Sequence, residues 1–78
     1  MDRIQAMQIF MRVAQAGSFV RAAETLSLPS STVTSSIKNL ENYLQVRLLN
    51  RTTRRVSLTA EGVQYLAQCQ EILALIEH

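Results

Sequence analysis

Apolar residues recur every three or four positions along most of the chain, which is the period of an amphipathic α-helix. The first such stretch predicts a helix from about Asp2 to Ala16. It ends at Gly17, because glycine adopts the left-handed conformation at little cost. A second, short helix is predicted over Phe19–Leu26, with Ser18 as its N-cap. The first third of the chain is therefore expected to be two helices joined by a tight turn.

A third helix is predicted from Ser30, a plausible N-cap after Pro29, to about Leu44. Its apolar positions make a single stripe that faces a core: Val33, Ile37, Leu40 and Leu44. The opposite face carries short or charged polar side chains: Ser31, Ser35, Lys38 and Asn42. Thr32 and Thr34 lie on the two flanks between these faces.

The helical period is lost from Arg47, and two short segments around a polar tip predict a β-hairpin. Its strands are Arg47–Leu49 and Arg55–Leu58, and its tip is 50–54. Thr59 then caps a last helix that runs to the end of the chain. Along that helix an apolar stripe has the a/d spacing of a coiled coil: Leu66, Cys69, Leu73 and Ile76, widened by Val63, Ile72 and Leu75. The pattern as a whole predicts a mostly α-helical fold with one small hairpin.

Length and charge limit the number of domains and the kinds of binding partner. Seventy-eight residues form one small domain at most, and a hydrophobic content of 47% is typical of a globular chain. The net charge is only +2, but the segment between Asn42 and Ala60 has no acidic residue. The same segment holds four arginines: Arg47, Arg51, Arg54 and Arg55. Such a block fits the phosphate backbone of a nucleic acid, although from charge alone a solvated loop explains it better.

Residues suited to catalysis or to a cofactor are scarce. His78 is the only histidine and the final residue, which is a poor position for a catalytic triad. Cys69 is the only cysteine, so no intrachain disulfide or multi-cysteine metal site is possible. No glycine-rich loop is present to hold a nucleotide. We therefore expect no enzyme, no cofactor and no metal.

The compartment is expected to be the cytoplasm. The longest apolar run is too short to span a membrane, and the N-terminus has no signal-peptide pattern. A single cysteine suits a reducing compartment.

Hydroxyl side chains are concentrated at the start of the third helix. Six serines and threonines lie between Ser30 and Ser36, although these residues are mediocre helix formers. Short hydroxyl side chains let a helix enter a major groove and contact bases or phosphates, whereas a tolerated polar surface is the alternative. The position of this helix, after a short alanine-containing helix and a tight turn, predicts a helix-turn-helix. The arginine-tipped hairpin is then a wing.

Several segments resemble the N-terminal domain of LysR-type transcriptional regulators. They are Gly17–Phe19, Ala22–Leu26, Val33–Thr34, Arg47–Arg51 and Leu58–Gly62. The resemblance implies a winged helix-turn-helix at 1–58 and a linker helix at 59–78 that pairs two protomers. It also implies binding of double-stranded DNA as a homodimer at an inverted repeat. A small-molecule effector is expected to act only through a further C-terminal domain that these residues do not contain.

The resemblance also implies which residues face DNA. From the recognition helix they are Ser30, Ser31, Thr32, Thr34, Ser35 and Lys38, and from the wing they are Arg51, Thr52 and Arg54. The a/d stripe given above is the expected dimer seam. Several departures from the family matter. Ser30–Ser31 stands where Gln-Pro is frequent, and Ser35 stands where arginine is frequent. Gln45 and Leu49 stand where glycine and phenylalanine are usual. A left-handed conformation at Gln45 costs about 1–2 kcal/mol relative to glycine.

Two hypotheses of different classes remain open. The leading one is a sequence-specific DNA-binding module that acts as a dimer. The rival is a helical protein–protein interaction module whose active surface is the last helix, which its apolar stripe supports. A steep loss of DNA affinity with salt separates them, because it reports phosphate contacts.

Overall fold

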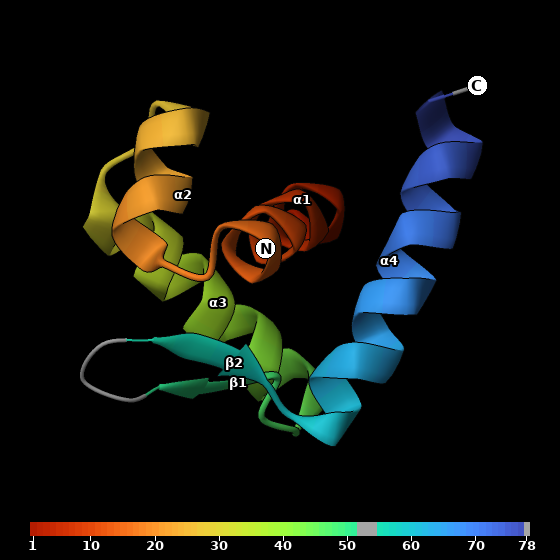
Figure 1. Cartoon of the computed structure of the whole chain (residues 1–78). Helices are drawn as coiled ribbons and strands as arrows, with labels where there is room; N and C mark the ends of the chain where they lie inside the picture. Colours follow the sequence, from red (N-terminus) through yellow and green to blue (C-terminus); the bar gives the residue numbers. More distant parts are fainter. Residues whose placement is uncertain (52–54, 78) are drawn as a thin grey trace.

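The computed structural model describes residues 1–51 and 55–77 (Figure 1). The elements, in chain order, are α1 (Arg3–Ala16), α2 (Phe19–Leu26), α3 (Ser30–Leu44), β1 (Leu49–Arg51), β2 (Val56–Leu58) and α4 (Ala60–Glu77). The predicted fold, three helices with a two-stranded hairpin and a long final helix, is confirmed. The predictions for Thr52 and Arg54 lie outside the described residues.

The first two helices end and begin where the sequence predicts. The Asp2 carboxylate accepts a hydrogen bond from the Gln5 N–H at 3.1 Å, which caps α1. Gly17 ends α1 with φ of 68°, in the left-handed region. The Ser18 hydroxyl oxygen accepts from the Arg21 N–H at 3.2 Å and caps α2. Gly17 and the Ser18 cap together fix the tight turn between α1 and α2.

The start and end of α3 differ in how well they were predicted. The N-cap is Pro29, with no side-chain hydrogen bond, and Ser30 is the first helical residue, so the predicted cap at Ser30 is wrong. The φ of −62° that the proline ring imposes already suits a helix entrance. At the other end Gln45 takes a left-handed conformation, with φ of 59° and ψ of 33°. Its side-chain Nε2 donates to the Asn42 carbonyl at 2.6 Å, which helps to hold this strained residue.

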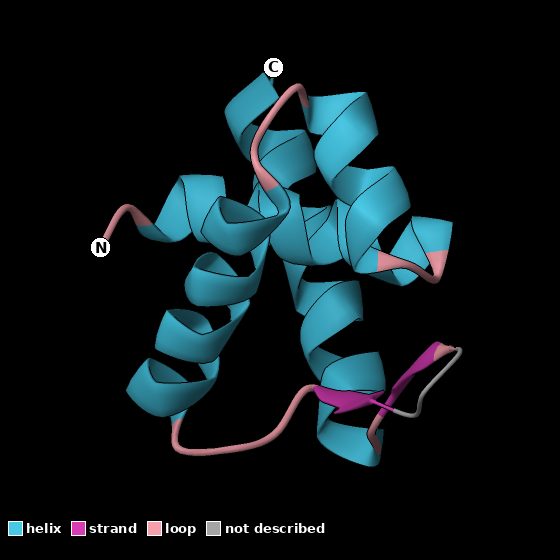
Figure 2. Cartoon of the chain, turned by 90° about the vertical axis from the view of Figure 1, so that its left-hand side faces the viewer, coloured by secondary structure: helices cyan, strands magenta, loops and turns pink. Residues whose placement is uncertain are grey.

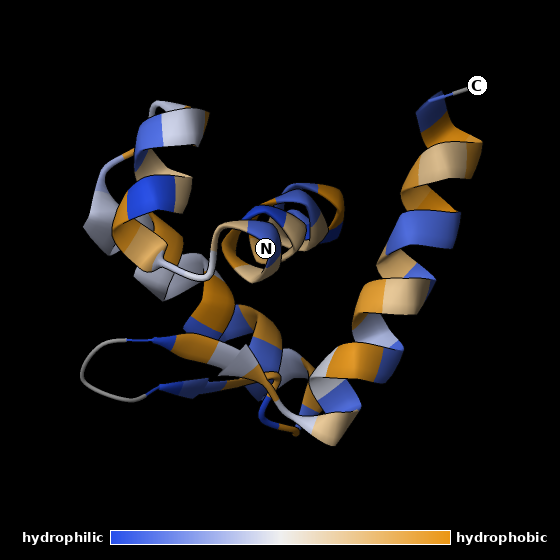
Figure 3. Cartoon of the chain, in the orientation of Figure 1, coloured by the Kyte–Doolittle hydropathy of each residue, from blue (hydrophilic) through white to orange (hydrophobic). Residues whose placement is uncertain are grey.

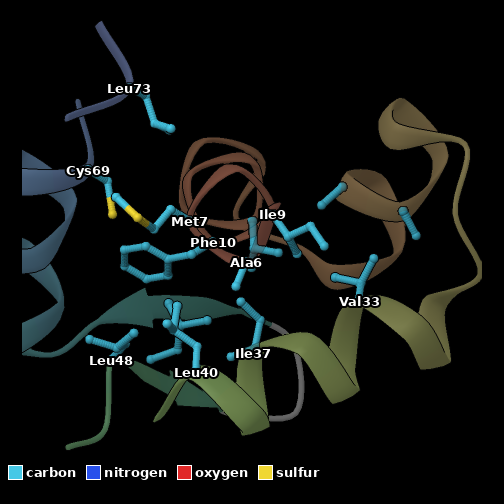
Figure 4. Packing of buried hydrophobic residues seen from close by; sticks show 14 residues of the cluster. Ala6, Met7, Ile9, Phe10, Val33, Ile37, Leu40, Leu48, Cys69 and Leu73 are labelled. Carbon is cyan, nitrogen blue, oxygen red and sulfur yellow. The ribbon is translucent and has the colours of Figure 1, made fainter. Parts of the chain in front are cut away.

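The core lies between α1, α2 and α3, and β1 and α4 close it (Figure 4). Phe10 and Val13 of α1 are fully buried, as are Ile37 and Leu40 of α3. Ala22 and the neighbouring Ala23 bring α2 close, because a methyl group lets another helix approach. Each position of the predicted α3 stripe up to Leu40 is buried, so the phase assigned to this helix is confirmed.

The hairpin pairs its strands antiparallel at one edge of the helical body (Figure 2). Leu49 pairs with Leu58, and Arg51 pairs with Val56. The first strand begins at Leu49, two residues later than predicted. One Glu41 carboxylate oxygen accepts the N–H groups of residues 48 and 49, at 2.7 and 3.2 Å, so a side chain of α3 anchors the entry to the strand.

The start of α4 is locked against the segment before β1. The Thr59 hydroxyl accepts from the Gly62 N–H at 2.9 Å, as the predicted cap requires, and donates to the Arg47 carbonyl at 2.6 Å. Gly62 is buried here, and a Cβ at this position would collide with the backbone carbonyl oxygen of Leu48. Glycine is therefore required because two backbones approach each other directly.

Two of the four residues of the predicted dimer seam along α4 lie in the core of the protomer. Cys69 and Leu73 are buried within the protomer, where they point toward α1 (Figure 4). Leu66 is half-buried against the same core, and Ile76 is exposed. The apolar side chains of α4 that remain exposed are Val63 (57%), Ile72 (41%), Leu75 (77%) and Ile76 (56%). The a/d spacing therefore mixes two faces of α4, and most of it belongs to the core.

Apolar residues are distributed along the whole of α4 (Figure 3). Even so, none of the helices in the described ranges has the length and apolarity needed to cross a bilayer.

Candidate nucleic-acid interface

The outer face of α3 presents a row of polar side chains to solvent. Ser31, Ser35, Lys38 and Asn42 are all exposed, while the opposite stripe is in the core. The burial of Val33, Ile37 and Leu40 fixes this orientation, because the two faces are half a helical turn apart. The exposed polar row is therefore a consequence of the hydrophobic pattern.

The remaining predicted residues of this helix lie around the row. Ser30 and Thr32 are exposed, whereas Thr34 is half-buried. Thr32 and Ser35 line a hollow between α3 and the N-terminus, together with Met1, Asp2, Gln5, Ser31, Ser36 and Asn39. Of the predicted side chains on α3, Thr34 is thus the least accessible.

A second hollow lies between α3 and β1, and we call it the basic hollow. It is lined by Lys38, Glu41, Asn42, Gln45, Val46, Arg47 and Arg51. Three cations thus come together from the helix, the connection and the strand. The only acid among them, Glu41, already accepts two backbone N–H groups, which offsets part of its negative charge. The basic hollow is therefore a candidate site for an anion such as a phosphate group.

Arg47 is a member of the basic hollow that the sequence prediction of site residues missed. Its position in the acid-free segment was the signal in the sequence that it could contact a phosphate. The sequence prediction placed Arg47 in a strand and left open a structural role, in which it pairs with Glu41 or Glu61. The structure leaves Arg47 exposed ahead of β1 and brings it to the same hollow as Lys38.

Arg51 lies at the edge of the basic hollow and also contacts α2. Its guanidinium carbon is 4.7 Å from the centre of the Phe19 ring, which is cation–π geometry. The sequence places Arg51 at a polar tip, whereas the structure places it in β1 against an aromatic face.

Chemistry other than binding has little support in the described residues. Burial raises the pKa of the Cys69 thiol to about 11, so this thiol is protonated and unreactive at neutral pH. Burial is also the main cause that raises the pKa of Tyr65, whose hydroxyl is buried and makes no hydrogen bond to the described part of the chain. Within 1–51 and 55–77, no group of histidine, cysteine and acidic residues could hold a metal ion.

The sequence between residues 4 and 63 matches the family described as bacterial regulatory helix-turn-helix protein, lysR family. The chain belongs to the LysR family. This membership agrees with the resemblance seen in the sequence. The family is one of regulators and not of enzymes.

Curated relatives and solved structures agree with this assignment. An HTH-type transcriptional repressor of Pseudomonas aeruginosa (strain UCBPP-PA14) is 49% identical over 99% of this chain and 24% of the relative. The transcriptional regulator CrgA of Neisseria meningitidis serogroup B is 49% identical over 88% of this chain and 23% of its own length. This LysR chain thus spans about a quarter of the length of these relatives.

The backbone also matches a solved structure of a LysR domain on DNA. The crystal structure of the CbnR_DBD–DNA complex superposes with a TM-score of 0.93 at 34% identity, over 95% of this chain and 85% of that one. The fold of this LysR domain is therefore that of a domain solved with DNA. Contacts from individual residues of this chain to DNA stay predictions.

Proposed function

We propose that this LysR domain is the sequence-specific, double-stranded DNA-binding module of a bacterial transcriptional regulator. The observation that carries the proposal is the junction of two surfaces. The exposed polar row of α3 continues into the basic hollow, where Lys38, Arg47 and Arg51 come together. A helix with short polar side chains beside a cluster of cations matches both requirements of DNA recognition, base contact and phosphate contact.

The two surfaces have different roles in binding DNA. α3 enters the major groove, where the hydroxyls of Ser31 and Ser35 hydrogen-bond base edges. Thr34 contributes from the flank, and Ser30 and Thr32 contact the backbone near the entry of the helix. The hairpin approaches the neighbouring phosphates, and Thr52 and Arg54, outside the described residues, stay predicted contacts from the sequence. Because Ser35 offers no guanidinium, this module reads that base step without the bidentate contact that arginine makes to guanine.

The module works as a homodimer on an inverted repeat. One helix-turn-helix contacts few base pairs, and two modules on a fixed axis supply the remaining specificity. The exposed apolar side chains of α4 support this arrangement: Val63, Ile72, Leu75 and Ile76. They pair with the same helix of a second copy, while Cys69 and Leu73 hold α4 on its own protomer. The whole regulator acts in the cytoplasm and senses a small molecule through a separate C-terminal domain.

A salt series on a selected duplex tests this proposal. The chain is first used to select bound duplexes from a random-sequence pool. Affinity is then measured by fluorescence anisotropy as the salt concentration rises. We expect the logarithm of the affinity to fall linearly with the logarithm of the salt concentration, with a slope of about −0.9 per phosphate contact.

A matched pair of variants assigns the slope to the basic hollow. Arg47→Ala is expected to flatten it by about one unit and to weaken binding to all duplexes alike. Arg12→Ala removes the same charge from a different hollow, between α1 and α4, and is expected to leave the slope unchanged. Binding that ignores salt, or no enrichment in the selection, would reject the proposal in favour of a protein–protein module.

A further inference from the structure

One aromatic residue links the helix-turn-helix to the hairpin. Cation–π pairs occur twice among the described residues, between Arg3 and Tyr43 at 4.8 Å and between Arg51 and Phe19 at 4.7 Å. The first pair joins α1 to α3 within the helical body. The second joins α2 to β1, at the last described residue before the tip of the hairpin.

Phe19 is held firmly enough to act as a fixed surface. It is the first residue of α2, directly after the Ser18 cap and the left-handed Gly17. Its ring is half-buried and packs against the core, so one part of it is anchored while another faces the hairpin. Arg51 is exposed and long, and on its own it would sample many rotamers.

The stack restricts Arg51 without consuming its hydrogen-bonding groups. A guanidinium is planar, and its five N–H donors point outward in that plane. The Phe19 ring lies against the guanidinium, whose central carbon is 4.7 Å from the ring centre. A ring face engages at most part of the five N–H donors, so the others stay available to a phosphate. Arg51 lines the basic hollow with Lys38 and Arg47, which places those donors beside two further cations.

We infer that Phe19 is a positioning residue that orients the Arg51 guanidinium toward the DNA backbone and sets the angle of the hairpin relative to α3. This inference rests on the proposed DNA-binding function and adds a residue to it. Phe19 contacts no DNA itself and acts only through Arg51. Its effect on DNA affinity therefore requires the arginine to be present.

A double-mutant cycle tests this dependence. Phe19→Leu keeps an apolar side chain on the core and removes the ring face. A cation–π stack at an exposed site corresponds to about a two- to fivefold change in an equilibrium constant. We expect Phe19→Leu to weaken binding to a selected duplex by that factor in the wild-type background, and to have no further effect in the Arg51→Ala background. Phe19→Tyr keeps the ring and is expected to bind as the wild type does.

Two controls separate this role from general destabilisation. Tyr43→Leu removes the other cation–π pair, together with the hydrogen bond that Arg3 donates to the Tyr43 hydroxyl, and is expected to change affinity by less than about twofold. NMR of the free wild-type protein is expected to show the Arg51 side-chain protons shifted upfield by the ring, a shift that persists in the DNA complex. If Phe19→Leu does not fold by circular dichroism, Phe19→Met repeats the cycle with a flexible side chain.

Three results would overturn the inference. An equal loss of affinity in both backgrounds assigns Phe19 to the core alone. Disappearance of the ring-current shift in the complex shows that Arg51 leaves the ring to bind. Failure of the wild-type chain to bind any duplex removes the proposed function, and the inference falls with it. Only this last result, which is measured on the wild-type chain, tests the proposed function.

Discussion

At the scale of single residues, a few contacts to backbone groups hold the connection before β1 in place. Composition alone gives no sign of them. Gly62 is buried against the Leu48 carbonyl, and the Thr59 hydroxyl joins α4 to the Arg47 carbonyl. Glu41 binds the N–H groups that precede and begin β1. These contacts fix the basic hollow, because they hold the connection that carries Arg47 against α3. None is visible in the hydrophobic pattern, since each joins residues that are far apart in sequence.

Both glycines are expected to resist replacement by alanine, but for different physical reasons. In an ordinary helix, replacing glycine by alanine stabilises a protein by about 1 kcal/mol. Gly62→Ala is instead expected to lower the free energy of unfolding by about 1–3 kcal/mol, because backbone must move. Gly17→Ala meets no atom within 4 Å and carries only left-handed strain, about 1–2 kcal/mol.

Urea denaturation of both variants tests this contrast. The wing and the start of α4 are expected to shift in the NMR spectrum of Gly62→Ala only. A Gly62→Ala protein as stable as the wild type would show that α4 does not approach Leu48 as described.

Alkaline pH is expected to destabilise the domain through Cys69. The folded state raises the thiol pKa from 9.0 to about 11, so between these values the unfolded chain loses its proton while the folded chain keeps it. Stability that is fully present below pH 9 is therefore lost as the pH rises to about 11. Tyr65 contributes in the same direction, because its pKa is also raised.

Cys69→Val isolates the thiol in this measurement. The free energy of unfolding, measured by denaturant titration from pH 8 to 11, is expected to fall less steeply for this variant. Identical pH profiles for the two proteins would mean that the thiol is not buried as described.

At the scale of elements, the sequence predicted what is local. The caps at Asp2 and Ser18, the stop at Gly17 and the stripe on α3 follow from neighbours within one or two helical turns, and all are confirmed. The start of β1 was misplaced because Glu41, in another element, anchors it. Spacing alone does not show which apolar stripe of α4 faces α1, so it could not separate the buried Cys69 and Leu73 from the exposed Ile76.

A substitution in the polar row on α3 is expected to change DNA affinity and to leave the stability of the fold unchanged. Ser35 is exposed, so Ser35→Ala is expected to leave the thermal midpoint nearly unchanged. If its hydroxyl contacts a base, the variant loses about 1 kcal/mol of affinity for the selected duplex and little for a random-sequence duplex. The ratio of the two affinities is the measurement. An equal loss on both duplexes would assign Ser35 to a phosphate.

At the scale of the whole molecule, α4 has one face on the protomer and another without a partner in the described chain. Its buried face rests on α1, and its exposed apolar residues continue toward the C-terminal end. A small domain with an exposed apolar helix face is expected to associate with a second copy. The basic hollow is lined by residues of α3, the connection after it and β1, and by none of α4, so pairing through α4 leaves the proposed DNA surface open.

Two substitutions on α4 separate association from folding. Leu75→Asp changes an exposed side chain and is expected to yield a folded monomer in sedimentation across a concentration series. Leu73→Asp buries a carboxylate against α1 and is expected to cost several kcal/mol of stability, seen as lost helix signal. A Leu75→Asp protein that still sediments as the wild type does would place self-association elsewhere.

The central claim is that DNA binds across the polar row of α3 and the basic hollow. The most direct test is an NMR titration of the 78-residue chain with a duplex selected from a random pool. The largest amide shifts are expected at Ser31, Ser35, Lys38, Arg47 and Arg51. The hollow between α1 and α4, with Arg12 and Gln70, is expected to be unchanged. Shifts concentrated on α4, with α3 unaffected, would contradict the claim.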